Sequence, residues 1–239
     1  MYKIRLFSSV VSRYSALCVR KQTTLKIYLH LKRNLSSSTM SLDMKIQGQT
    51  SEMDSKWTLI GISGCTNGGK TTLASALANH FPGSIVVNQD KFFRSDDSKE
   101  HIIIPELNHK NWERLEAVDW DAMMADLEKT IHSKPPNKNS LLIVEGHIIF
   151  NHPKLRNIFD KRYFLTLDRE ECIRRRIQRV YDPPDIPGYF DMCVWPMYLL
   201  NLQDVQENCS GVKYFDGNSR KEEILECVLS DIQSIMSEK

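Results

Sequence analysis

Beyond residue 56, short apolar runs alternate with longer amphipathic stretches along the chain. Short apolar runs predict buried strands, and apolar residues at helical spacing predict helices. The predicted strands are residues 57–63, 84–89, 141–146, 163–167 and 212–215. The predicted helices are residues 70–81, 119–133, 168–180, 195–208 and 220–236. Strands that alternate with helices favour an α/β fold around a central parallel sheet.

The segments between these elements are polar or rich in turn-forming residues. Residues 94–111 are polar and aperiodic and predict a loop, and KPPNKNS at 134–140 separates a helix from a strand. YDPPDIPGYF at 181–190 predicts a rigid connection, because proline fixes its own backbone angle. The polar stretch before Lys56 predicts a linker, which places a leader and linker at residues 1–55 and the folded domain at residues 56–239.

Charge is distributed unevenly between the leader and the domain. Residues 1–42 contain eight Lys or Arg residues and no acidic residue, which leaves 24 basic and 30 acidic residues in the rest of the chain. A basic, serine-rich and acid-free leader is typical of a mitochondrial targeting segment. The alternatives are a solvated basic tail and an upstream extension of the reading frame that is little used. Translation from Met40, Met44 or Met53 would give a cytosolic form, so the predicted location is mitochondrial or cytoplasmic.

Composition narrows the classes of partner. A mildly acidic domain argues against a general nucleic-acid binder, which would present a basic face. Apolar stretches fall short of the roughly 20 residues that span a bilayer, so no membrane insertion is predicted. The six cysteines are scattered without a C-x-x-C pair or metal-ligand spacing, which predicts free thiols in a reducing compartment. The pattern specifies no oligomeric state.

The segment GCTNGGKTT lies between the first predicted strand and the first predicted helix. It matches the phosphate-binding pattern G-x-x-x-x-G-K-[ST] in the required context, through Gly64, Gly69, Lys70 and Thr71. Glycines let successive backbone N–H groups point at phosphate oxygens, and the helix N-terminus adds its positive dipole end. Lys70 is expected on the β- and γ-phosphates and the Thr71 hydroxyl on Mg²⁺. The sequence therefore predicts a nucleoside triphosphate site, in which Cys65 fills space.

Two carboxylates follow predicted strands. Asp90 comes directly after the second strand, and Glu145 lies at the end of the third. Ligands gather at the carboxyl ends of parallel strands, so we expect Asp90 to face the γ-phosphate held by Lys70. There it could accept the proton of an attacking hydroxyl and reach the Mg²⁺ shell, with Glu145 as a further metal or water ligand. The alternatives are a turn or cap at Asp90 and an ordinary strand end at Glu145.

This constellation predicts a kinase for a small molecule with a hydroxyl group. Phe92 and Phe93 would offer an apolar wall to a flat substrate. A GTPase would carry N-K-x-D, whereas the nearest stretch, NKNS at 137–140, lacks the aspartate. A basic lid that stabilises the transferred phosphoryl group is predicted from Arg174, Arg175, Arg176 and Arg179. These four cannot all face one ligand, so one or two are expected to be structural; the alternative is a solvated basic face.

Several stretches together resemble one family. They are LIGISGCTNGGKTTLA, QDKFF, LIVEG, KRYFLTL, EECIRRRIQRVYDPPDIPGYFD and VWPMY. This set resembles the nicotinamide riboside kinases, within the uridine-kinase-like P-loop kinases, from residue 57 to about residue 217. The resemblance implies a P-loop nucleoside-kinase fold and Mg²⁺-dependent transfer of phosphate from ATP, with GTP as an alternative donor, to the 5′-hydroxyl of nicotinamide riboside. The alternatives are a uridine, cytidine or other ribonucleoside kinase and a catalytically idle nucleotide-binding protein.

The resemblance also implies roles for individual residues. Those on the nucleotide side are Gly64, Cys65, Thr66, Asn67, Gly68, Gly69, Lys70, Thr71, Thr72, Arg175, Arg179, Val180, Tyr181, Ser219, Arg220 and Lys221. Those on the nucleoside side are Asp90, Lys91, Phe92, Phe93, Trp112, Glu113, Arg176, Tyr181 and Asp182. Trp112 and Glu113 stand where the family usually has Tyr-Asp, to stack the pyridinium and bind ribose hydroxyls. Lys91 stands where an acid is common. These departures leave the ranking of nucleosides open.

Overall fold

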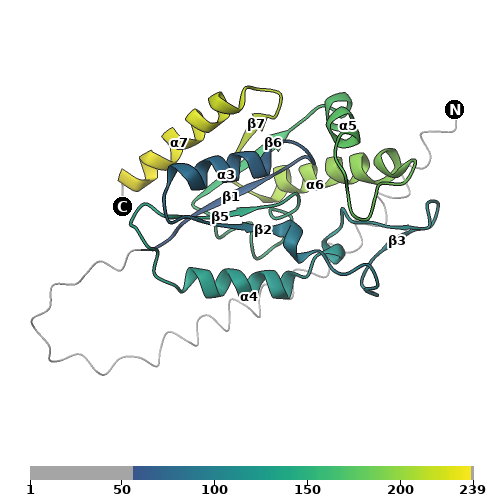
Figure 1. Ribbon diagram of the computed structural model, residues 1–239, viewed down its shortest axis with the longest axis horizontal. Coiled ribbons are helices and arrows are strands. Elements are labelled where there is room, and N and C mark those ends of the chain that lie inside the picture. The colour runs from purple at the N-terminus through teal and green to yellow at the C-terminus, as the bar shows by residue number, and fades with distance from the viewer. Residues whose placement is uncertain (1–55, 238–239) are drawn as a thin grey trace, which may run out of the picture. The chain divides into compact units, whose positions relative to one another are not determined.

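The computed structural model describes residues 56–237. The predicted leader and linker, at residues 1–55, lie outside the described residues. The strands are β1 (Thr58–Gly64), β2 (Ile85–Asn88), β3 (Ile103–Ile104), β4 (His109–Lys110), β5 (Leu141–Glu145), β6 (Lys161–Thr166) and β7 (Val212–Asp216). The α-helices are α3 (Lys70–His80), α4 (Trp120–Ile131), α5 (Arg169–Ile177), α6 (Trp195–Asn208) and α7 (Lys221–Ser237). The predicted alternation of strands and helices is confirmed (Figure 1).

A five-stranded parallel sheet in the order β2-β5-β1-β6-β7 forms the centre of the domain. The first strand of the chain, β1, is therefore the middle strand of the sheet. Glu145 on β5 is in register with Ile62 on β1 and with Asn88 on β2. Because these strands end together, the segments that follow β1, β2 and β5 meet at one edge of the sheet.

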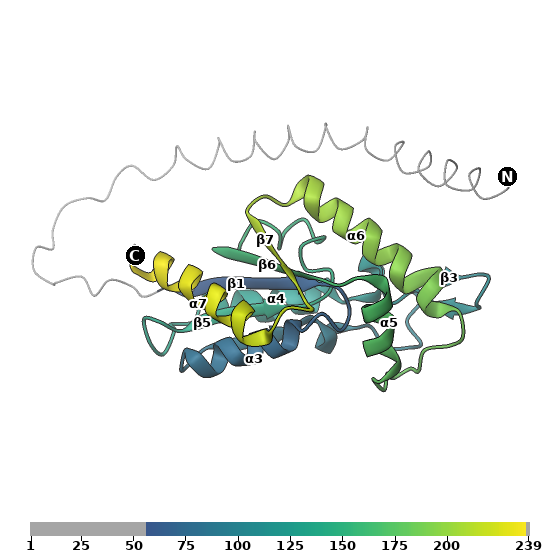
Figure 2. The same cartoon turned by 90° about the horizontal axis from the view of Figure 1, so that it is seen from above.

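Apolar side chains of the strands alternate between two cores, one on each face of the sheet. Leu141 and Ile143 point into a core with α3 and α7, which lie side by side. Leu142 and Val144 point into a second core with α4 and α6. Figures 1 and 2 show the resulting three layers, in which the sheet lies between two pairs of helices. Burial on both faces explains why the central strands read as continuous apolar runs.

The ends of α5 differ from the prediction. Asp168 caps the N-terminus, because its side chain accepts a hydrogen bond from the Glu171 N–H at 2.7 Å. The helix ends at Ile177 instead of residue 180. Ile177 is 77% exposed and Val180 is 96% exposed, so no packing is available to extend the helix, and packing supplies most helical stability in proteins. Arg179 and Val180 therefore belong to the loop that follows.

The segment predicted as a loop at residues 94–111 contains a short antiparallel pair. Ile103 pairs with Lys110 and Ile104 with His109. Lys110 also forms an ion pair with Asp96 at 2.5 Å. Two-residue strands give no alternating pattern, so the sequence carries no signal for them. The pair holds His109 in the lining of a cavity at the edge of the central sheet.

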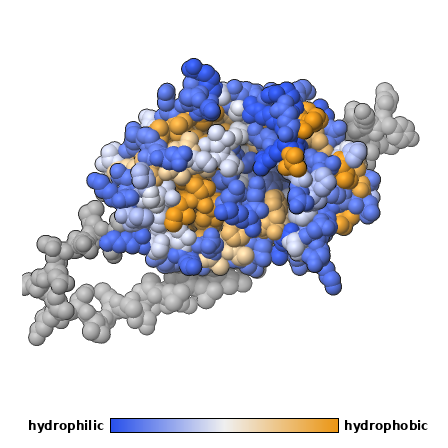
Figure 3. Space-filling model, in the orientation of Figure 1, coloured by the Kyte–Doolittle hydropathy of each residue, from blue (hydrophilic) through white to orange (hydrophobic). Residues whose placement is uncertain are grey.

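The surface seen in Figure 3 is dominated by hydrophilic residues and broken by small apolar areas. Between residues 56 and 237, the structure contains no helix that is long and apolar enough to cross a membrane.

Candidate active site

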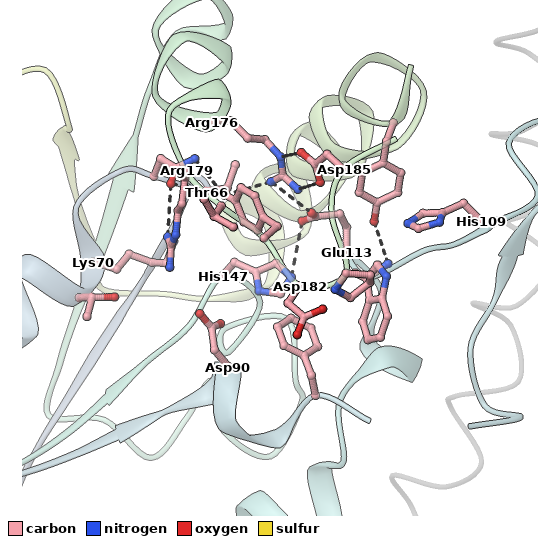
Figure 4. A pocket seen from close by; sticks show the side chains of 18 of the residues that line it. Thr66, Lys70, Asp90, His109, Glu113, His147, Arg176, Arg179, Asp182 and Asp185 are labelled. Atoms are coloured by element: carbon pink, nitrogen blue, oxygen red, sulfur yellow. Dashed lines mark hydrogen bonds and ion pairs between the residues drawn. The ribbon is translucent and has the colours of Figure 1, made fainter. Parts of the chain in front are cut away.

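A cavity of about 530 Å³ lies where the segments after β1, β2 and β5 meet. The phosphate-binding loop and Asp90 form one end of the cavity. Residues 109–113 and the loop after α5 form the other end. Its lining comprises Thr66, Asn67, Lys70, Thr71, Asp90, Phe93, Arg94, Asp96, His109, Trp112, Glu113, Glu145, His147, Arg176, Arg179, Val180, Tyr181, Asp182, Pro183, Asp185 and Tyr189 (Figure 4).

The phosphate-binding loop has the backbone shape that the sequence pattern predicts. Gly64 has φ +133°, and a Cβ there would lie 2.1 Å from the Leu165 carbonyl oxygen, so only glycine fits. Gly69 has φ +97° and leads directly into α3. The first turn of α3 contains no acidic side chain. Lys70 Nζ donates to the carbonyl oxygens of Gly64 at 3.2 Å and Cys65 at 2.7 Å. The loop and helix terminus thus present a positively charged cradle for phosphate.

Thr71, Glu145 and Asp90 supply oxygen atoms beside this cradle. The Thr71 hydroxyl donates to Glu145 Oε1 at 2.9 Å. Burial raises the pKa of Glu145, and the Asp90 charge adds to this effect, whereas the Thr71 hydrogen bond and Lys70 oppose it. No group of three or more His, Cys, Asp or Glu side chains within residues 56–237 could hold a metal ion alone. Mg²⁺ is commonly held by one or two carboxylates together with substrate phosphates, and this donor set fits that arrangement.

Asp90 is available for chemistry. It lies in a 3-10 turn, Gln89–Phe92, directly after β2. Its backbone N–H donates to the Asn88 side chain at 2.7 Å, which fixes the turn while the carboxylate remains exposed in the cavity. The structure thus brings Asp90 into one cavity with Lys70, Thr71 and Glu145, as predicted from the strand ends.

The loop after α5 is held over the cavity by Arg176, whose side chain is 7% exposed. Arg176 donates to both carboxylate oxygens of Asp185, at 2.5 and 2.9 Å, and to the Thr66 hydroxyl at 3.2 Å. Its guanidinium lies 4.4 Å from the centre of the Tyr181 ring. A bidentate pair of this kind fixes geometry as well as charge. Arg176 therefore connects the phosphate-binding loop to the lid (Figure 4).

Glu113 lies buried at the far end of the cavity. Arg176 Nη1 is 3.8 Å from Glu113 Oε1, and His147 Nε2 is 3.6 Å from Oε2. Burial raises the pKa of Glu113 to about 7, although Arg176 and Lys70 oppose the rise. Burial, with Lys70 and Arg176 nearby, lowers the pKa of His147 to about 3. The imidazole is thus uncharged near neutral pH, and its contact with Glu113 is not an ion pair.

Aromatic rings surround the same end. The backbone N–H of Trp112 donates to the Tyr189 hydroxyl at 3.0 Å, and the Phe93 and Trp112 rings meet edge to face at 5.7 Å. Phe92 and Phe93 were both predicted to offer an apolar wall to the substrate. Phe93 does line the cavity, but the prediction is wrong for Phe92, which packs against the core. The 3-10 turn rotates these neighbours apart. Lys91 points to solvent, outside the cavity lining.

A second cavity of about 490 Å³ lies on the other side of the phosphate-binding loop, next to α3 and the start of α7. Six residues predicted for the nucleotide side line it: Gly68, Gly69, Thr72, Arg175, Ser219 and Lys221. The remaining nucleotide-side residue of this region, Arg220, pairs with Glu223 at 2.6 Å and is 76% exposed. The phosphate-binding loop therefore separates two cavities.

The arginines of α5 divide as expected. Arg174 is exposed and pairs with Glu171, so it is structural. Arg175 also pairs with Glu171 and donates to the backbone carbonyls of Asn67 at 3.2 Å and Gly217 at 3.1 Å. Arg175 thus faces the second cavity, whereas Arg176 faces the first.

Sequence reasoning missed seven residues of the first cavity: Arg94, Asp96, His109, His147, Pro183, Asp185 and Tyr189. His147 follows Glu145 by two positions at a strand end, which is a usable signal because ligands gather there. The others lie in segments without periodicity, the predicted loop at 94–111 and the connection at 181–190. Only the folded chain brings them to the cavity.

Several known proteins are similar to this chain in sequence. Residues 60–196 match the AAA domain family. Nicotinamide riboside kinase 1 from Homo sapiens is 40% identical over 192 residues, which cover 76% of this chain and 95% of that protein. Nicotinamide riboside kinase 2 from Homo sapiens is 37% identical over 189 residues, which cover 74% and 81%. A uridine kinase from Streptococcus equi subsp. zooepidemicus is 26% identical over 142 residues, which cover 51% and 67%. The chain belongs to the nicotinamide riboside kinase family of P-loop kinases.

Proposed function

We propose that this protein transfers the γ-phosphoryl group of ATP to the 5′-hydroxyl of nicotinamide riboside and forms nicotinamide mononucleotide, a precursor of NAD. The observation that carries this proposal is one phosphate-binding loop between two cavities, with Asp90 on the side opposite to Arg175 and Ser219. A kinase needs one site for the nucleotide donor and one for the acceptor substrate, and the two sites must meet at the γ-phosphate. The identity to nicotinamide riboside kinases 1 and 2 supports the choice of substrate.

Each residue near the phosphate has one task in this reaction. Asp90 accepts the proton of the 5′-hydroxyl as the phosphoryl group is transferred. Lys70 leaves the carbonyls that it contacts and binds the β- and γ-phosphates. Thr71 and Asp90 would hold Mg²⁺, and Glu145 accepts a hydrogen bond from the Thr71 hydroxyl. A bound Mg²⁺ would supply positive charge for the phosphate oxygens. The Arg176–Asp185 clamp keeps the lid closed and excludes water.

The other end of the cavity suits a cationic nucleoside. Trp112 and Tyr181 offer faces on which a pyridinium can stack, and a cation over an aromatic face is stabilised. Glu113 and Asp182 supply negative charge near the ring. The Glu113 carboxylate would accept hydrogen bonds from ribose hydroxyls. The lining therefore offers stacking, charge and hydroxyl recognition in one place.

The direct test is incubation of the purified protein with Mg-ATP and nicotinamide riboside, followed by chromatography of the products. We expect nicotinamide mononucleotide and ADP to form in equal amounts. ADP formation without the mononucleotide would contradict the proposal, because it would indicate hydrolysis. A uridine or cytidine kinase is the rival function, and a comparison of kcat/KM for the three nucleosides separates the two.

We also propose that residues 1–42 direct the protein to mitochondria. Support comes from eight basic residues and no acidic residue in this segment. Fusion of residues 1–55 to a fluorescent protein should place fluorescence in mitochondria, and replacement of Arg5, Arg13 and Arg20 by Glu should abolish this. Diffuse fluorescence from the unaltered fusion would contradict the proposal and favour a cytosolic protein.

A further inference from the structure

Hydrogen bonds to β1 fix the position of the backbone at His147. It follows β5, where the Gly146 N–H donates to the Ile62 carbonyl at 3.1 Å. The Ser63 hydroxyl donates to the His147 carbonyl oxygen at 3.2 Å. Ser63 and Ile62 belong to β1, the strand that leads into the phosphate-binding loop. The backbone at Gly146 and His147 is therefore tied to β1 by these two hydrogen bonds.

The ring projects from this anchor toward the nucleoside end of the cavity. Its side chain is 14% exposed, and Nε2 lies 3.6 Å from Glu113 Oε2. Its centre lies 5.8 Å from the centre of the Phe93 ring, and Trp112 lines the same cavity. Figure 4 shows the imidazole and the Glu113 carboxylate pointing toward one another. His147 thus lies beside Glu113, one of the two residues that stand at the family's nucleoside-binding positions.

One nitrogen of the ring is unsatisfied. Nε2 is buried and has no hydrogen-bond partner among residues 56–237. Buried polar atoms are almost always paired, so an exception in a cavity points to a missing partner. A separation of 3.6 Å is too long for a hydrogen bond, but such contacts shorten when a substrate closes an active site. The nearest group that can fill the role is the Glu113 carboxylate, oriented by a bound ribose.

We propose that His147 is a positioning residue that orients Glu113 and thereby selects nucleosides with a 2′-hydroxyl group. This inference rests on the proposed function. A carboxylate held on one side by Arg176 and on the other by His147 presents its free lone pairs in a fixed direction. A substrate without the 2′-hydroxyl leaves that buried carboxylate unpaired, and a site built for a hydroxyl rejects such analogues strongly.

The test compares nicotinamide riboside with nicotinamide 2′-deoxyriboside as acceptors, with saturating Mg-ATP. The measured quantity is the ratio of their kcat/KM values. His147→Phe keeps an aromatic ring and removes the hydrogen-bonding atoms. We expect this variant to reduce the preference for the riboside about tenfold, through KM for the nucleoside, while KM for ATP stays unchanged. His147→Gln, whose amide can still reach Glu113, should restore much of the preference.

A double-mutant cycle identifies the partner. In a Glu113→Gln background, His147→Phe should leave the preference as it is, because the group that it orients is already altered. The matched control is His152→Phe. His152 stacks on Trp120 at 4.3 Å and also has an unpartnered ring nitrogen within the described residues, but it lies outside the cavity lining. His152→Phe should leave both the preference and KM unchanged.

Each outcome decides one question. An unchanged preference in His147→Phe, or a loss of kcat with both substrates alike, would overturn the inference and leave a merely structural histidine. If wild-type protein turns over uridine but not nicotinamide riboside, the proposed function fails, and the same variants are compared on uridine and 2′-deoxyuridine. If His147→Phe does not fold, His147→Asn carries the same test, because its amide is too short to reach Glu113.

Discussion

Burial raises the pKa of Glu113 to about 7, so this carboxyl group changes its charge within the range where most enzymes work. The ionised form is the one that accepts hydrogen bonds from ribose. We therefore expect kcat/KM for the nucleoside to fall as the pH drops from 8 to 6. Steady-state rates at limiting nucleoside between pH 5.5 and 8.5 check this. In Glu113→Gln, kcat/KM should no longer fall between pH 8 and pH 6. A fall that persists in this variant would assign the ionisation to another group.

The same group affects the stability of the free protein. A carboxyl pKa raised from 4.5 to about 7 means that folding disfavours the charged form. The resulting penalty is fully present above pH 7 and disappears as the pH falls toward 4.5. Glu113→Gln should thus raise the free energy of unfolding at pH 8 by up to about 3 kcal/mol, because Arg176 keeps its contact with Asp185. Urea unfolding at pH 8 and pH 5 checks this, and an equal gain at both pH values would contradict it.

Asp90 is the residue on which the chemical step depends. Asp90→Asn removes the proton acceptor and should lower turnover by about 10²–10⁴, while nucleotide binding largely survives. Turnover assays and titration with a fluorescent ATP analogue measure the two effects. Asp96→Asn is the matched control, because Asp96 lines the same cavity but pairs with Lys110. Loss of nucleotide binding together with turnover would instead make Asp90 chiefly a metal-holding group.

At the scale of elements, the lid depends on the pair between Arg176 on α5 and Asp185 on the following loop. Their side chains are 7% and 31% exposed, so Asp185→Ala leaves a buried guanidinium with fewer partners. We expect a loss of about 1–3 kcal/mol in the free energy of unfolding and a several-fold rise in KM for the nucleoside. Denaturant titration and steady-state kinetics check both effects. An unchanged KM would show that the lid closes without this pair.

Elements with a strong local signal could be predicted from the sequence. The phosphate-binding loop is specified by glycines at fixed positions between an apolar strand and a helix, and Gly64 and Gly69 have the positive φ angles that the pattern requires. The C-terminus of α5 could not be predicted, because the helical pattern continues to residue 180, whereas Arg176 is the last buried residue and the helix ends at Ile177. Phe92 and Phe93 point apart because of a 3-10 turn, which periodicity does not reveal.

At the scale of the whole domain, function follows from the strand order. Because β1 is the middle strand, the phosphate-binding loop lies at the centre of the sheet edge, with one cavity toward β5 and another toward β7. Strand alternation predicted the fold class, since it depends on local apolar runs. The order of the strands, and hence the meeting of Glu145 with Thr71, depends on long-range packing that no local pattern specifies.

The central claim is tested most directly by steady-state kinetics with Mg-ATP and three acceptors: nicotinamide riboside, uridine and cytidine. All three present a 5′-hydroxyl, so Asp90, Lys70 and Thr71 serve them equally, and only the nucleoside end of the cavity distinguishes them. We predict that kcat/KM for nicotinamide riboside exceeds that for either pyrimidine nucleoside by at least about tenfold. A higher kcat/KM for uridine or cytidine would contradict the account of the nucleoside site and leave the phosphate chemistry intact.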